Sequence, residues 1–133
     1  VLLMSIPVGT KGRAESLVTN DNTAIAAGSG TLPVFATPWM AALMEQASQT
    51  SLQPYLSEDE SSVGTHLAID HLSATPVGMK VWAESEVTAV DGRKVCLNVA
   101  AYDEAGLIGK GTHERFIIAK DRFLAKAQAK KGD

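Results

Sequence analysis

The segment that decides the fold is "TPWMAALMEQASQTSL", residues 37 to 52. Pro38 suits the first position of a helix, and Pro54 ends the helical pattern shortly after Leu52. Glu45 is the only ionisable residue in the segment. Because a helix with so little charge around its circumference must be covered on most of its sides, we expect other elements to surround it.

Strands dominate the rest of the chain. A short strand is predicted over residues 12 to 19, and a loop rich in small residues follows over 20 to 33. After the helix, alternating apolar residues predict strands over 63–72, 80–90, 93–103 and 107–120, joined mostly by short turns. This order predicts an α+β fold, in which an antiparallel sheet packs one face against the helix. One helix cannot cover both faces, so we expect a second copy to cover an edge or a face.

The composition is typical of one globular domain. The 133 residues include 12 basic and 15 acidic residues, a net charge of −3, with no broad cationic face for nucleic acid. No apolar run approaches the roughly 20 residues that cross a bilayer, and "VLLMSIP" is too short for a secretory signal. We therefore expect a cytoplasmic protein with no membrane or nucleic-acid partner. We expect the single cysteine, Cys96, to be a packed small residue.

Two polar segments are given no chemical role. The acidic run "SEDESS", residues 57 to 62, is predicted to be a solvated loop. The tail "DRFLAKAQAKKGD", residues 121 to 133, is predicted to be either a frayed helix or disordered.

The stretch "GTHLAIDHLSATP", residues 64 to 76, contains two histidines, of which His71 shares the apolar face of the strand and His66 does not. A buried imidazole loses its charge unless an anion is near, and Glu45 is the one candidate on the helix. We hypothesise that both share a site with the Thr37 hydroxyl. Such a set of acid, base and polar group is typical of acyl transfer, with the amides of the first helical turn available to an oxyanion.

Each of these residues also has a simpler structural interpretation. Thr37 could cap the helix, and His71 could bond a backbone carbonyl inside the core. Glu45 lies opposite the middle of the apolar stripe, so in a monomer it would face water. That stripe is formed by Trp39, Met40, Leu43, Met44 and Ala47.

Three motifs together resemble the family of hotdog-fold acyl-CoA thioesterases related to fluoroacetyl-CoA thioesterase: "VFATPWMAALMEQAS", "GTHLAIDHLSATPVGM" and "GKGTHERFII". The resemblance implies a single hotdog domain in residues 1–133, with its core at about 10–120. It also implies a five-stranded antiparallel sheet wrapped around a long central helix. Two protomers would form a homodimer with shared active sites, in which Glu45 could face the second copy; whether two dimers associate further is left open.

The resemblance carries the family's catalytic threonine, glutamate and histidine onto Thr37, Glu45 and His71. It also places Gly64 where a main-chain group approaches the thioester. The implied reaction is hydrolysis of an acyl-CoA thioester to the free acid and coenzyme A. In it, His71 is the general acid and base, Glu45 the nucleophile or the base that activates water, and Thr37 positions the substrate. No metal or cofactor is implied beyond the coenzyme A of the substrate.

The sequence departs from the fluoroacetyl-specific enzyme in the lid ahead of the helix. The resemblance implies bulky aromatic residues there, whereas "AAGSGTLP", residues 26 to 33, is small and flexible. We therefore expect a short or medium acyl group. His66 and His113 are expected to be structural or surface residues. The alternatives are a hydratase or dehydratase on the same scaffold, and a non-catalytic module that binds an acyl thioester or small ligand.

Overall fold

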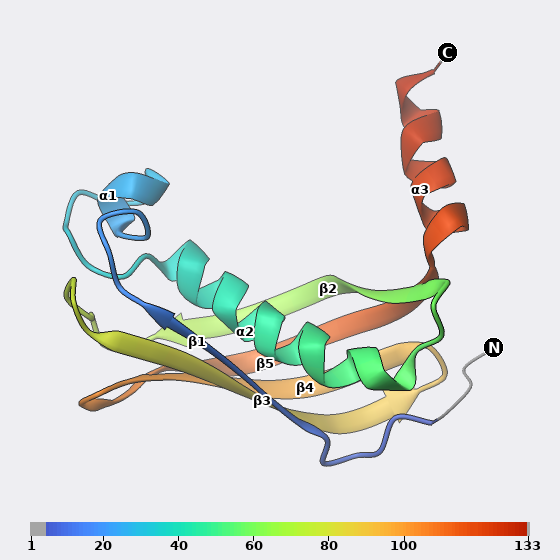
Figure 1. The fold of residues 1–133 in the computed structure, drawn as a ribbon, viewed down its shortest axis with the longest axis horizontal. Helices are drawn as coiled ribbons and strands as arrows, with labels where there is room; N and C mark the ends of the chain where they lie inside the picture. Colours follow the sequence, from blue (N-terminus) through green and yellow to red (C-terminus); the bar gives the residue numbers. More distant parts are fainter. Residues whose placement is uncertain (1–4, 133) are drawn as a thin grey trace.

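One curled antiparallel sheet wraps along a central helix in the computed structural model, which describes residues 5–132 (Figure 1). All of its strands run antiparallel to their neighbours, in the order β1-β3-β4-β5-β2. The predicted α+β class and the five-stranded sheet are confirmed. The elements are β1 (Lys11–Leu17), α1 (Ala24–Ala27), α2 (Thr37–Leu52), η1 (Gln53–Tyr55), β2 (Glu60–His71), β3 (Lys80–Asp91), β4 (Lys94–Asp103), β5 (Gly106–Ala119), α3 (Lys120–Gln128) and η2 (Ala129–Lys131).

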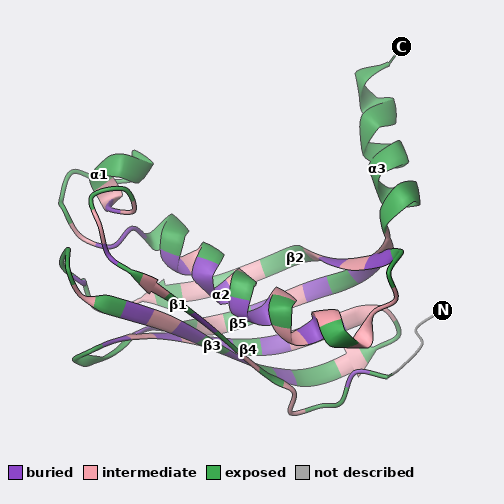
Figure 2. Cartoon of the chain, in the orientation of Figure 1, coloured by how far each residue is buried: buried purple, intermediate pink, exposed green. Residues whose placement is uncertain are grey.

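Helix α2 forms the core together with the concave face of the sheet, as the burial colours of Figure 2 show. Its buried residues are Met40, Leu43, Met44, Ala47, Ser48 and Leu52. Trp39, which was predicted to belong to the apolar stripe, is about half exposed, so that expectation is wrong. The buried stripe is centred on Met40, Leu43, Met44 and Ala47, and Trp39 lies on its flank beside Glu15 and Gln46.

A glycine lets the helix approach the sheet closely. A Cβ atom at Gly12 of β1 would overlap the carbonyl oxygen of Ala47 on α2. Because a close-packed interior cannot absorb an extra methyl group without moving its neighbours, any larger residue here would push α2 away from the sheet.

Strand β2 forms one edge of the sheet and follows the predicted alternation. Leu67, Ile69 and His71 are partly buried, whereas His66, Ala68 and Asp70 are exposed. Thr65 was predicted on the inner face but is exposed, because a bulge between Gly64 and His66 interrupts the pairing with β5.

The acidic run is only partly a loop, so the prediction of a solvated segment over 57–62 is wrong for its second half. Strand β2 begins at Glu60, which is only 4% exposed. The backbone N–H of Ser57 donates to Glu60 Oε1 at 3.1 Å, and Arg93 Nη1 lies 3.4 Å from Glu60 Oε2. These partners replace water around the carboxylate, which makes its burial tolerable.

The described C-terminal segment lies outside the sheet. The tail forms a helix rather than a disordered segment over the part that is described, and α3 projects away from the end of β5 with all its residues exposed (Figure 1). The first strand begins at Lys11 and ends at Leu17, close to the predicted 12–19. Within residues 5–132, no helix has the length and hydropathy of a membrane span.

Candidate active site

Thr37 and His71 form the first part of the site. Thr37 is the first residue of α2, and His71 is the last residue of β2. Thr37 Oγ1 lies 2.7 Å from His71 Nδ1, a short hydrogen bond. Thr37 is therefore not the helix cap that one interpretation predicted: the capping position belongs to Ala36, which has no side-chain hydrogen bond to the helix. The hydroxyl turns away from the helical amides because the imidazole offers it a partner.

The second ring nitrogen of His71 has no partner among residues 5–132. His71 Nε2 is buried and makes no hydrogen bond. Burial lowers the pKa of His71, and the nearby backbone of Ser73 opposes the shift. A histidine with a lowered pKa is neutral near pH 7, and a neutral imidazole has one nitrogen able to accept a proton. The Thr37 hydrogen bond holds the ring in place for that role.

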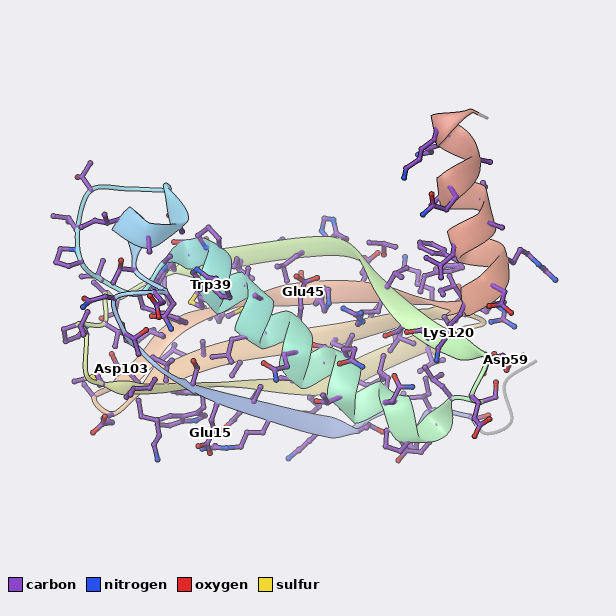
Figure 3. All side chains as sticks on the ribbon, turned by 45° about the horizontal axis from the view of Figure 1, so that its top comes forward. Glu15, Trp39, Glu45, Asp59, Asp103 and Lys120 are labelled. Carbon is purple, nitrogen blue, oxygen red and sulfur yellow. The ribbon has the colours of Figure 1, made fainter. Side chains whose placement is uncertain are left out.

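Glu45 forms the second part of the site, on the side of α2 that faces β2 and β5 (Figure 3). Its side chain is 43% exposed. A Cβ atom at Gly64 would lie 2.6 Å from Glu45 Oε2, so a larger residue here would displace the carboxylate from its position over β2. Arg115 Nη1 lies 3.9 Å from Glu45 Oε2. Gly64 pairs with Arg115 across the ladder between β2 and β5, which brings the three residues together.

The guanidinium of Arg115 is held rigidly below Glu45. Its Nε donates to Ser62 Oγ at 2.8 Å, its Nη2 donates to the Ser62 carbonyl at 2.9 Å, and its Nη1 lies 3.2 Å from His113 Nε2. His113 Nδ1 lies 2.8 Å from the carbonyl oxygen of His66 and must donate to it, because a carbonyl oxygen only accepts. His113 Nε2 is therefore the acceptor for Arg115. This network fixes a neutral His113 and aims a cation at Glu45.

Sequence reasoning missed the two buried residues of this network. His113 is 1% exposed, and the prediction placed it among structural or surface residues without linking it to Glu45; Arg115 was not singled out. The signal was present in the alternation of β5, where Gly111, His113 and Arg115 share one face. The alternation does not show which residues of α2 pack over this face, so it could not link His113 and Arg115 to Glu45.

The two parts of the site lie apart within one protomer. Thr37 and Glu45 are eight residues apart on α2, which separates them by about 12 Å along the helix axis. His71 and Gly64 are seven residues apart on β2, a separation of about 20 Å in an extended strand. The structure thus brings Thr37 to His71 and Glu45 to Gly64, but it does not bring these pairs together in one chain.

A hollow of about 280 Å³ opens beside the Thr37–His71 pair. The segment ahead of α2 forms one wall, through Ala24, Ser29 and Val34, and Leu72 after β2 forms another. Bridges from Thr23 to Phe35 and from Val34 to Pro76 hold this segment against the rest of the domain. Apart from His71, the residues that line the hollow carry no ionisable side chain. Its chemistry suits an uncharged group.

Comparison with known proteins supports this interpretation of the fold and indicates the class of reaction. A family model described as fluoroacetyl-CoA-specific thioesterase matches residues 18–121. A fluoroacetyl-CoA thioesterase from Streptantibioticus cattleyicolor is 42% identical over 97 residues, which cover 73% of this chain and 70% of that protein. The solved structure of a fluoroacetyl-CoA thioesterase superposes with a TM-score of 0.90 at 34% identity, covering 96% of this chain and 98% of that one. A thioesterase superfamily member from Thermus thermophilus superposes with a TM-score of 0.89 at 32% identity, covering 97% and 96%.

The architecture is therefore that of the hotdog-fold thioesterases. Within that class, the chain belongs to the family of the fluoroacetyl-CoA-specific thioesterases, and it is an acyl-CoA thioester hydrolase.

The buried histidines predict how stability depends on pH. Burial lowers the pKa of His113, aided by the charge of Arg115 and opposed by the hydrogen bond to His66. The unfolded chain, in which histidine titrates near about 6.5, then binds protons at a higher pH than the folded chain does. The free energy of unfolding should therefore decrease as the pH is lowered from about 7 to about 5.5, with His71 contributing in the same direction.

Urea unfolding across this pH range is the measurement. His113→Gln should flatten the dependence, since the amide keeps a donor and an acceptor but does not titrate. His66→Gln, at the exposed position, serves as the control and should leave the slope unchanged. An equal slope in His113→Gln and the wild type would contradict the assignment of a neutral His113.

Proposed function

We propose that two copies of the chain form a homodimer whose shared sites hydrolyse short or medium acyl-CoA thioesters through Thr37, Glu45 and His71. The observation that carries the proposal is the unpartnered Nε2 of His71. A buried ring nitrogen without a hydrogen-bond partner indicates that another reacting group, which a single protomer does not supply, lies beside it during the reaction. Glu45 completes the chemistry only if the second copy provides it, because the two residues are far apart in one chain.

The free edge of the sheet supports this pairing. Among the strands of residues 5–132, β2 has β5 on one side and no strand on the other. Edge strands with a free row of N–H and C=O groups pair readily with another chain. In an antiparallel pair of two β2 strands with the two-fold axis near Leu67, residue 71 of one copy lies opposite residue 64 of the other. Glu45, which lies over Gly64, would then face His71 across the axis.

The proposed chemistry breaks the carbon–sulfur bond of the thioester. Either Glu45 removes a proton from water while the water oxygen attacks the carbonyl carbon, or a Glu45 oxygen attacks first and water then cleaves the mixed anhydride. In both routes the coenzyme A sulfur leaves as the thiolate. In the first route, the proton that Glu45 takes from water passes through His71 to this thiolate. In the second route the thiolate leaves before water attacks and takes its proton from solvent, and His71 then accepts the proton of the water that cleaves the anhydride. Thr37 holds the imidazole for this relay, and the main chain at Gly64 approaches the carbonyl.

The two roles of Glu45 differ in whether an acyl–enzyme bond forms. A nucleophilic Glu45 predicts that the peptide containing it gains the mass of the acyl group when a single turnover with a slow substrate is quenched in acid. Activation of water predicts that the mass of this peptide stays unchanged throughout the turnover. Mass spectrometry of the quenched and digested protein distinguishes the two routes.

A shared site predicts that two inactive variants complement each other. His71→Ala and Glu45→Ala should each lower kcat by about 100-fold or more, because each removes a proton-transfer or reacting group. Subunit exchange in an equal mixture makes half of the dimers mixed, and each mixed dimer has one site with both residues intact. The mixture should therefore recover about a quarter of the wild-type activity.

The control is His66→Ala, which changes a histidine on the exposed face of the same strand and should retain nearly full activity. No recovery after subunit exchange, with dimers shown by size measurement, would mean that each site lies within one chain. A monomer with full activity would contradict the shared site altogether.

The proposed substrate class rests on the lid. Residues 26–33 contain no aromatic side chain, and Leu32 is 63% exposed rather than packed over the hollow. Phe35, which lines the hollow, is buried in the core. Such a lid has no large side chain to discriminate the fluorine of a fluoroacetyl group from the hydrogen of an acetyl group or from a longer alkyl chain. The proposal needs no cofactor beyond the coenzyme A of the substrate, and a cytoplasmic location fits a substrate of that kind.

A panel of acyl-CoA esters measures this expectation. Acetyl-, butyryl- and hexanoyl-CoA should be hydrolysed with kcat/KM within about tenfold of the value for fluoroacetyl-CoA, because a lid without large side chains neither grips the fluorine nor encloses a longer chain tightly enough to discriminate by size. A preference for fluoroacetyl-CoA well beyond tenfold would show that the discrimination does not depend on aromatic lid residues.

A further inference from the structure

A second cavity, of about 440 Å³, lies at the other end of β2, beneath the C-terminal helix. It is bounded by the loop before β2, the end of β5 and the first turns of α3. Arg93, Arg122, Phe123 and Lys126 contribute side chains to it. The thioester chemistry described above uses none of these residues.

The wall formed by α3 carries uncompensated positive charge. Five of the 12 basic residues of the chain lie between positions 120 and 131, together with a single acid, Asp121. Arg122 and Lys126 are four residues apart and therefore occupy the same side of the helix. Within residues 5–132, neither of them makes an ion pair, whereas Arg93 is paired with Glu60 at 3.4 Å. Unpaired cations around a cavity favour an anionic ligand.

The opposite wall has a different character. Ser57 and Asp59 line the cavity from the loop before β2, and their oxygens can accept hydrogen bonds from amino and hydroxyl groups. Phe123 lines the cavity and is 43% exposed, so its ring is available for stacking by a flat base. A nucleotide combines these features, since it carries phosphates at one end and a base and sugar at the other. A bare polyanion or a lipid surface would not use the acidic wall.

The position of the cavity relative to Glu45 agrees with a coenzyme A ester. In the ladder between β2 and β5, Gly64 pairs with Arg115 and Glu60 pairs with Ala119. The cavity therefore begins four residues along the strands from Gly64, a distance of about 13 Å. This separation is comparable to an extended pantetheine arm, the part of coenzyme A that joins the thiol to the pyrophosphate.

We propose that this cavity binds the adenosine 3′-phosphate 5′-diphosphate end of coenzyme A. Arg122 and Lys126 contact the phosphates, and Phe123 stacks on the adenine. The inference rests on the proposed function in one respect, because it takes the thioester to lie at Glu45 and Gly64. The α3 helix is then a part of the substrate site and not a frayed tail.

Binding of adenosine 3′,5′-bisphosphate to the whole protein tests the site without catalysis. Calorimetry should show saturable binding to the wild type, weakened about tenfold or more in the double variant Arg122→Ala/Lys126→Ala. The matched control is Lys130→Ala/Lys131→Ala, which removes the same charge from the end of the same helical segment outside the cavity. It should bind within about twofold of the wild type. Equal weakening in both double variants, or in neither, overturns the proposal.

Steady-state kinetics give a second readout. Arg122→Ala/Lys126→Ala should raise KM for an acyl-CoA by about tenfold and leave kcat nearly unchanged, because the nucleotide lies away from the reacting bond. The matching acyl-pantetheine, which lacks the nucleotide, should be hydrolysed equally by the wild type and the variant. A variant that loses activity on both substrates alike would overturn the proposal.

The two proposals fail in different ways. His71→Ala should bind adenosine 3′,5′-bisphosphate as tightly as the wild type does, since His71 is at the far end of β2. Nucleotide binding by a wild-type protein that hydrolyses no acyl-CoA would support the nucleotide site and contradict the proposed function. If the wild type hydrolysed acyl-CoA normally but did not bind the nucleotide, the proposed function would be supported and the nucleotide site would be contradicted.

Discussion

The structure depends on the burial of one nearly uncharged helix against the concave face of a curled sheet. Met40, Met44 and Ala47 are fully buried in that contact, and Gly12 lets the backbones of α2 and β1 approach. Because the interior is close-packed, the contact fixes the rotation and depth of α2. Those two parameters decide that Glu45 points toward β2 and β5 and that Thr37 meets the end of β2. The positions of the candidate catalytic side chains therefore follow from packing.

The same geometry keeps the two pairs of candidate residues apart in one chain. A straight helix keeps Thr37 and Glu45 about 12 Å apart, and an extended β2 keeps His71 and Gly64 farther apart still. No local rearrangement of side chains closes these gaps. A free β2 edge offers a simple solution, since a second strand can bring the missing half of each site. On this view the edge that would otherwise be open to unwanted pairing is the element that completes the enzyme.

Several features could be predicted from the pattern of residues and others could not. The alternation of β2 correctly placed His71 inward and His66 outward, since side-chain direction in a strand has a period of two. The same rule failed at Thr65, where a bulge adds a residue. Thr37 looked equally suitable as a helix cap, and the acidic residues 57–62 looked like a solvated loop. Both of those predictions failed because a distant partner, His71 for Thr37 and Arg93 for Glu60, changed the local preference.

The sequence by itself determined the class of fold, the span of the central helix, the inward face of β2 and, through three motifs, the thioesterase family. These properties depend on local periodicity and on residue types, which are written along the chain. Only the tertiary structure decided that Arg115 and His113 lie beneath Glu45, that Thr37 bonds His71, and that Arg122 and Lys126 border a cavity. Those contacts join residues far apart in sequence, and they exist only once strand register and helix packing fix where each side chain points.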